Sequence, residues 1–206
     1  MTEREEKKRW IRLSYDLSED SPLAPGLPAI SREVISSIAE GSPSNTTIVR
    51  MCMHVGTHVD APLHFARGGA AITDFDVNEF CFNNPLILDV PVRDAELVTP
   101  EHLEPSSKSI ANRDILLVRT GFGKYRSTDP DRYQLHGPGF AESGAKYLAE
   151  NFPSLRCLGL DTISLVAMRH MDEGVRAHQA LLRPDRKFLI IEDMKLDAEL
   201  TSLEEV

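Results

Sequence analysis

The sequence predicts one domain of the α/β class, and three observations support this prediction. The chain has 206 residues, a length that suits a single domain with a substantial core. The apolar runs 114–120 and 155–160 are typical of strands, and residues 116–118 are apolar on both faces, as in the buried strands of parallel sheets. Residues 140–152 have the apolar stripe of an amphipathic helix, which we expect to pack on the strand that follows it.

The composition is that of an ordinary globular protein, with 41% hydrophobic and 27% charged residues. The formal net charge of -9 argues against a nucleic-acid partner, because binding to phosphate requires a basic face. No apolar run approaches the ~20 residues that span a bilayer, and the N-terminal MTEREEKKR is charged where a signal peptide would be apolar. We therefore expect a cytoplasmic protein with neither a nucleic-acid nor a membrane partner.

The ends of the chain differ in composition from its middle. Residues 1–9 are mostly charged and are expected to form a solvated tail, which leaves 10–206 as the folded domain. Residues 197–206 are expected to form an acidic tail or a short helix. The three cysteines are too few and too scattered for a disulfide framework, and we expect Cys52 and Cys157 to be buried thiols.

Local patterns predict the elements of the N-terminal half. Residues 10–17 are predicted to form a first strand, and 21–28, with three prolines and a glycine, a loop. The pattern over 29–41 fits a helix and a strand equally well. Residues 45–53, NTTIVRMCM, are rich in β-branched residues and alternate in polarity, so a strand is expected to lead into the segment that follows.

Fewer signals mark the chain after residue 64. We expect a loop over 65–84 that helps to cover the site, and a strand over 87–92. Residues 124–138 are polar, and 187–196 contain the apolar run FLII followed by Glu192. A buried carboxylate is costly unless it is paired, hydrogen-bonded or bound to a cation, so Glu192 either has such a partner or emerges into water at the strand end.

The segment 54–64, HVGTHVDAPLH, concentrates residue types that bind metals. It holds three of the chain's seven histidines together with an aspartate. Neutral imidazole and carboxylate are ligands that suit zinc, manganese and similar divalent ions. The helical zinc-protease motif needs Glu directly after its first His, and Val55 occupies that position, which excludes this class.

The spacing of this segment predicts an extended conformation with bends. Gly56, Thr57 and Pro62 each disfavour a helix. Side chains two apart along a strand leave the same face of the backbone. The four candidate residues have the same parity: His54, His58, Asp60 and His64. A straight strand of this length would extend about 33 Å, too long for one site, so Gly56 and Pro62 are predicted to bend the chain.

The same segment resembles the HxGTHxDxPxH signature of the metal-dependent cyclase family. The best-known members of this family are bacterial kynurenine formamidases, and isatin hydrolases are relatives. Four further segments fall in the family's order, namely 119–122 (RTGF), 159–164 (GLDTIS), 178–182 (HQALL) and 192–194 (EDM). The resemblance covers roughly residues 12 to 196.

The resemblance implies a fold, an assembly and a set of residue roles. The fold would be of the swivelling β/β/α type, with a small barrel-like mixed β-sheet flanked by helices, in a homodimer or homotetramer. One divalent ion, zinc or manganese, would be held by His54, His58 and Asp60. A second ion would be held by Asp60 and His178, with Glu192 touching both. His64 would be the proton donor and acceptor, and not a permanent ligand.

The implied reaction is hydrolysis of a small amide by a metal-bound hydroxide, because a bound divalent ion pulls the pKa of water toward ~7. The substrate would be a formamide such as N-formylkynurenine, with a cyclic amide, imide or lactone as the alternative. Ala24 stands where kynurenine formamidases usually have an aromatic residue, which favours the alternative. A metal-binding protein without turnover is a third hypothesis, but such a protein has no need of His64.

Several polar residues fall outside these roles. Asp161, Thr162 and Ser164 are predicted to brace a strand end by turn hydrogen bonds, with substrate contact as the alternative. We assign no role to three further histidines, which are His102, His136 and His170.

Overall fold

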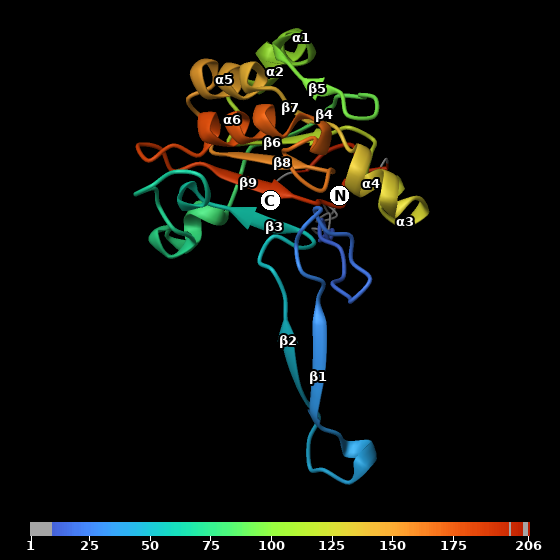
Figure 1. Ribbon diagram of the computed structural model, residues 1–206. Coiled ribbons are helices and arrows are strands. Elements are labelled where there is room, and N and C mark those ends of the chain that lie inside the picture. The colour runs from blue at the N-terminus through green and yellow to red at the C-terminus, as the bar shows by residue number, and fades with distance from the viewer. Residues whose placement is uncertain (1–9, 198, 204–205) are drawn as a thin grey trace, which may run out of the picture.

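The computed structural model describes residues 10–197, 199–203 and 206, and it shows a mixed α/β arrangement (Figure 1). The predicted class, a mixed β-sheet with flanking helices, is confirmed. The charged tail predicted over residues 1–9 lies outside the described residues.

The strands and helices have the following bounds. The strands are β1 Ser31–Ser36, β2 Thr46–Arg50, β3 His58–Asp60, β4 Pro85–Asp89, β5 Leu97–Val98, β6 Ile115–Arg119, β7 Gly139–Phe140, β8 Cys157–Leu160 and β9 Leu189–Glu192. The α-helices are α1 Pro100–Leu103, α2 Ser107–Ile110, α3 Tyr125–Thr128, α4 Pro130–His136, α5 Glu142–Asn151 and α6 Met171–Leu181. Short 3₁₀ helices are η1 Ile38–Glu40, η2 Pro62–His64, η3 Ile72–Asp74, η4 Val77–Phe80, η5 Glu104–Ser106 and η6 Met168–His170. Within the described residues, no helix combines the length and the apolar character needed to cross a membrane.

The core is built around a five-stranded sheet with the order β3-β9-β8-β6-β4. Strands β4, β6, β8 and β9 are parallel, and β3 pairs antiparallel with β9 at one edge. Helices α5 and α6 lie together over one face of the sheet (Figure 1). Leu116 and Val118 of β6 pack in the core on this helical side, whereas Ile115 and Leu117 pack in a second cluster. Because both faces are covered, the continuous apolar run of β6 is explained.

The second cluster contains the C-terminal segment. Leu196 and Leu200 are buried in it, and the backbones of Phe82 and Val206 exchange hydrogen bonds of 2.7 and 2.8 Å. The prediction of an acidic tail or short helix over 197–206 is therefore wrong for the described part of this segment, because its leucines cover the sheet. Cys157 is buried in the same cluster as predicted, whereas Cys52 is only partly buried.

The strand predicted over residues 10–17 is absent. The backbone N–H of Tyr15 donates to the Thr57 hydroxyl at 3.1 Å, and the Leu13 carbonyl accepts from the N–H of Lys195 at 2.9 Å. These bonds reach different segments, so no ladder forms. The ambiguous stretch 29–41 contains β1, which pairs antiparallel with β2 in a hairpin that projects from the body (Figure 1).

A close approach between α5 and the segment after β5 gives a test of the packing. A Cβ at Gly144 would collide with the Val98 carbonyl oxygen and lie 3.3 Å from the Thr99 Cα. Alanine is a better helix former than glycine by about 1 kcal/mol. We nevertheless expect Gly144→Ala to lower the free energy of unfolding by about 1–3 kcal/mol in urea titration, because backbone must move. Ser143→Ala is the control, and a Gly144→Ala chain as stable as this control would contradict the packing.

Candidate metal centre

The bends predicted at Gly56 and Pro62 are present. Gly56 has φ +66°, in the left-handed region that favours glycine, and turns the chain between His54 and His58. Pro62 begins the 3₁₀ helix η2, which ends at His64. The extended part, β3, is only three residues long, so the chain turns on both sides of it and the side chains of 54–64 can converge.

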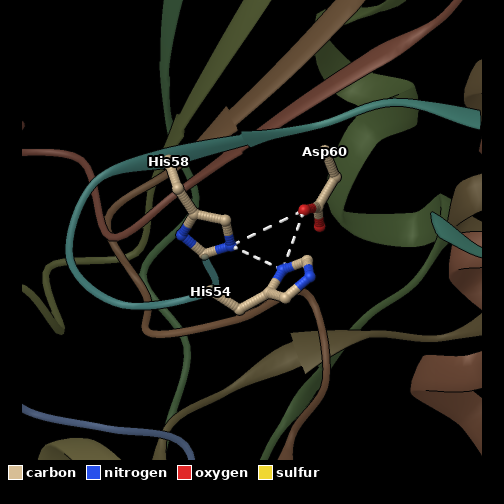
Figure 2. Close-up of side chains that lie close together, drawn as sticks. All are labelled: His54, His58 and Asp60. Carbon is tan, nitrogen blue, oxygen red and sulfur yellow. Dashed lines mark hydrogen bonds and ion pairs between the residues drawn. The ribbon is translucent and has the colours of Figure 1, made fainter. Parts of the chain in front are cut away.

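The first group of metal-binding side chains consists of His54, His58 and Asp60, which point toward one another (Figure 2). The Nδ1 atom of His54 lies 3.1 Å from Asp60 Oδ1 and 3.2 Å from His58 Nε2. The Nε2 atom of His58 lies 3.6 Å from the same Asp60 oxygen. Three donor atoms of types that suit zinc or manganese thus face one small volume.

The second group consists of Asp60, His178 and Glu192 and shares its aspartate with the first. The antiparallel pairing of β3 with β9 places His58 opposite Glu192, and α6 supplies His178. His178 Nε2 lies 3.3 Å from Glu192 Oε1 and 3.9 Å from Asp60 Oδ2, and Glu192 Oε2 lies 3.5 Å from His58 Nε2. The two carboxylates therefore stand between the imidazoles of both groups.

Hydrogen bonds on the outer side of these residues fix their orientation. The Nδ1 atoms of His58 and His178 face the carbonyls of Gly56 and Gly174 at 2.8 and 2.9 Å. A carbonyl only accepts, so each Nδ1 carries the proton and each Nε2 is free to bind an ion. Glu192 Oε1 accepts from the Ser164 hydroxyl at 3.0 Å and from the N–H of Leu165 at 2.7 Å.

The floor of the site is buried and its mouth is open. Asp60, His178 and Glu192 are between 2 and 4% exposed, whereas the side chains of His54 and His64 are 33 and 35% exposed. Both carboxylate oxygens of Asp60 are buried without a hydrogen-bond donor among the described residues. A buried carboxylate without donors is costly, and a divalent cation would compensate it. The residues present therefore fit a metal ion.

His64 lies beside the two groups and outside both of them. Its ring stacks on that of His54, with centroids 4.0 Å apart, and its Nε2 lies 3.9 Å from Asp60 Oδ2. Phe65 packs on the ring of His178, with centroids 4.1 Å apart. Burial lowers the pKa of His64, so its imidazole is neutral near pH 7 and can accept a proton.

The electrostatics of the site favour positive charge next to the carboxylates. Burial alone would raise the pKa of Glu192, but His178, His58 and the N–H of Leu165 outweigh it and lower the pKa. The contact with Asp60 raises the pKa of His54. The site therefore favours positive charge close to its two carboxylates.

The structure brings together all six residues singled out in the sequence, which are His54, His58, Asp60, His64, His178 and Glu192. The alternative in which Glu192 emerges into water is wrong, since the residue is 4% exposed. Asp161 accepts hydrogen bonds from the backbone N–H groups of Thr120 and Gly121 and so braces a strand end, as predicted. Ser164 has a role that the sequence did not reveal, because its hydroxyl reaches Glu192.

The other three histidines lie elsewhere. His102 faces Thr99 at the start of α1, His136 contacts Arg169, and His170 precedes α6.

A cavity of about 660 Å³ opens at the carboxyl ends of β4, β6 and β8, and its lining includes none of the six residues of the metal centre. This cavity is therefore separate from the two groups of metal-binding side chains.

Comparison with known proteins gives the family. The mixed α/β fold carries two groups of imidazoles and carboxylates that could each hold a metal ion and that share Asp60. A family model described as "Putative cyclase" matches residues 11–166, which is more than half of the chain. The chain belongs to this cyclase family, and the resemblance seen in the sequence is confirmed.

Individual relatives agree with this assignment. A kynurenine formamidase of Delftia acidovorans is 28% identical over 190 residues, which cover 92% of this chain and 84% of that enzyme. An uncharacterized protein of Haemophilus influenzae is 38% identical over 125 residues, which cover 61% of this chain and 88% of that protein. An isatin hydrolase bound to the product analogue thioisatinate has the same fold, with a TM-score of 0.75 at 18% identity and coverage of 93% of this chain and 81% of that one.

Replacing the shared carboxylate tests the metal centre. Asp60→Asn removes a buried negative charge and nearly preserves the shape of the side chain. In the presence of a chelator we expect the variant to melt at a higher temperature than the parent, because the parent buries a carboxylate without a donor. With zinc or manganese added, the melting temperature of the parent should rise and that of the variant should not.

The matched control is Asp94→Asn, which changes an aspartate paired with Arg132 on the surface. This control should respond to metal as the parent does. An equal metal response of Asp60→Asn and the parent would contradict the proposed ligand set.

Proposed function

We propose that this chain hydrolyses the carbon–nitrogen bond of a small amide, with a divalent metal held by the two groups that share Asp60. The observation that supports it most directly is the buried Asp60 carboxylate, which has imidazoles on two sides and makes no hydrogen bond within the described residues. His54, His58 and Asp60 would hold one ion, and Asp60, His178 and Glu192 a second. Zinc and manganese both suit this donor set.

A divalent ion bound there supplies Lewis acidity, which activates water and polarises the carbonyl that is attacked. The chain's own residues complete the reaction. His64, partly exposed beside the ligands, takes a proton from the attacking water and returns it to the departing nitrogen. The buried floor of the site excludes water from the far side of the substrate.

The loop that contains Ala24 and the relatives favour different substrate classes. The isolated bridge between Leu23 and Val55 holds this loop against the metal-binding segment. An aromatic residue at this place would offer a stacking surface for an aromatic substrate, and Ala24 offers none. A formamide such as N-formylkynurenine is the leading substrate, and the kynurenine formamidases among the relatives support it. The absent aromatic residue favours the alternative, a cyclic amide, imide or lactone.

A substrate panel distinguishes these possibilities. The metal-loaded protein is assayed with N-formylkynurenine, isatin, dihydropyrimidines and small imides. Hydrolysis of the formamide supports the leading proposal, and hydrolysis of only a cyclic substrate supports the alternative. Stoichiometric metal with no hydrolysis of any of them would contradict both in favour of a metal-binding protein without turnover.

The role of His64 can be separated from that of the ligands. We expect His64→Ala to retain the metal and to lose about 10²-fold or more in kcat, because the proton transfer loses its catalyst. His170→Ala is the control, since His170 lies outside both groups and should leave kcat unchanged. The measurements are metal content of the purified variant and steady-state kinetics. Unchanged turnover in His64→Ala would end its assigned role.

We infer further that the chain assembles with a second copy through the β1–β2 hairpin. Apolar side chains are exposed on both faces of this hairpin and along the segment that leads from it toward His54. They are Val34, Ile35, Ile48, Val49, Met51 and Met53. An isolated two-stranded hairpin is marginal in water, so a hairpin of this kind requires a surface to pack on.

Charge favours a second copy as the occupant of this surface. Two chains of net charge -9 repel each other over most of their surface. The hairpin region 31–50 is different, since its two arginines and two glutamates cancel. The hairpin is therefore where two copies can approach with the least repulsion.

Paired substitutions test this assembly. Val34→Ser with Val49→Ser removes apolar side chains that are 63 and 52% exposed, and we expect it to produce monomers in a dilution series by light scattering. Val77→Ser with Met171→Ser changes side chains that are 74 and 52% exposed on the body, and it should leave the assembly intact. A monomeric parent chain, or equal dissociation of both double variants, would contradict the proposal.

A further inference from the structure

Directly after Glu192, the residue Asp193 has an unusual backbone and a buried charge. Its φ of +51° lies in the left-handed region, which is strained for a residue with a Cβ. Its side chain is 1% exposed. A buried aspartate in a strained conformation persists only where its surroundings hold it.

Two side chains from the α3–α4 region hold the Asp193 carboxylate. The Nε and Nη2 atoms of Arg126 donate to it at 2.8 to 3.0 Å. The Tyr133 hydroxyl donates to its Oδ1 at 2.6 Å. The guanidinium of Arg126 also stacks over the ring of Tyr15, 4.0 Å from its centroid. A planar guanidinium with two donors fixes a carboxylate in orientation as well as in position.

The backbone of Asp193 connects this pair to both sides of the metal centre. Its carbonyl accepts a hydrogen bond from the Thr57 hydroxyl, and its N–H donates to the Thr162 carbonyl at 2.8 Å. Thr57 lies between His54 and His58, on the segment that supplies the first group of ligands. Asp193 is also joined by a peptide bond to Glu192, the last residue of β9 and a member of the second group of ligands.

We propose that the Arg126–Asp193 ion pair is a positioning device for the metal centre, which holds the Thr57 turn and the end of β9 at a fixed separation. This proposal depends on the metal-dependent function proposed above. Arg126 and Asp193 lie outside both groups of candidate ligands, so the pair acts through Thr57 and Glu192. Loss of a partner that orients a ligand commonly costs about tenfold to a hundredfold in metal affinity.

A metal-affinity series tests the proposal. The affinity for zinc alone is measured by competition with a chromophoric chelator, and thermal unfolding is recorded in parallel. We expect Arg126→Met to weaken zinc binding about tenfold or more. Arg126→Lys should recover part of this loss, because it keeps the charge and loses the planar fork.

Thr57→Val tests the link between Asp193 and the Thr57 turn with a smaller change. It removes the hydroxyl that donates to the Asp193 carbonyl and nearly preserves side-chain volume. We expect it to weaken zinc binding by itself, and the combination with Arg126→Met to weaken it by less than the product of the two single effects. This series keeps the proposal testable if Arg126→Met fails to fold.

Two controls distinguish positioning from general stability. Arg132→Met breaks a similar arrangement, a two-point ion pair with Asp94 and a stack over Tyr125, at a place without contact to the metal centre. Leu148→Ala opens a cavity under α5, and it lowers the melting temperature without touching the ligands. Both should bind zinc as the parent does.

The outcomes separate this proposal from the proposed function. Zinc affinity that is unchanged in Arg126→Met and in Thr57→Val would overturn the positioning role alone. The positioning role would also be overturned if Leu148→Ala and Arg126→Met lowered the melting temperature equally and weakened zinc binding equally. A parent chain that binds no zinc or manganese would overturn the proposed function together with this proposal.

Discussion

The proposed metal centre depends on one constraint, the burial of an Asp60 carboxylate that makes no hydrogen bond within the described residues. Such a group is costly by itself, and the imidazoles around it are oriented so that their free nitrogens face it. A divalent cation satisfies the aspartate and the imidazoles together. The ordinary core of the protein, with its two covered sheet faces, gives this polar site a rigid support.

Three separate parts of the chain must meet to form the site around Asp60. The edge strand β3 brings His58 and Asp60 against β9, and α6 places His178 beside Glu192. Gly56 turns the chain so that His54 returns to the same place. The left-handed Asp193 then ties the end of β9 to the turn. The part of the site that faces solvent lies at His54 and His64. Under the proposed function, substrate would enter there, above the buried residues that would hold the metal.

Much of the fold and of the candidate site could be predicted from the sequence, because the patterns that indicate them lie within short segments. The parity of the 54–64 segment and its two bending residues predicted convergence, and the apolar run of β6 predicted a buried strand. Contacts between distant segments gave no such signal. The Arg126–Asp193 pair joins the polar stretch 124–138 to a residue directly after Glu192, and nothing in either segment predicted the contact. Residues 10–17 have strand propensity but meet no continuous strand edge. The acidic composition of the C-terminal segment likewise predicted an acidic tail or a short helix, although its leucines pack against the sheet.

The most direct measurement is anomalous diffraction from crystals of this protein grown with zinc or manganese. We predict one peak within bonding distance of His54, His58 and Asp60, or two peaks, with the second between Asp60, His178 and Glu192. Anomalous density confined to other parts of the surface, with the Asp60 carboxylate free of any ion at full metal occupancy elsewhere, would contradict it.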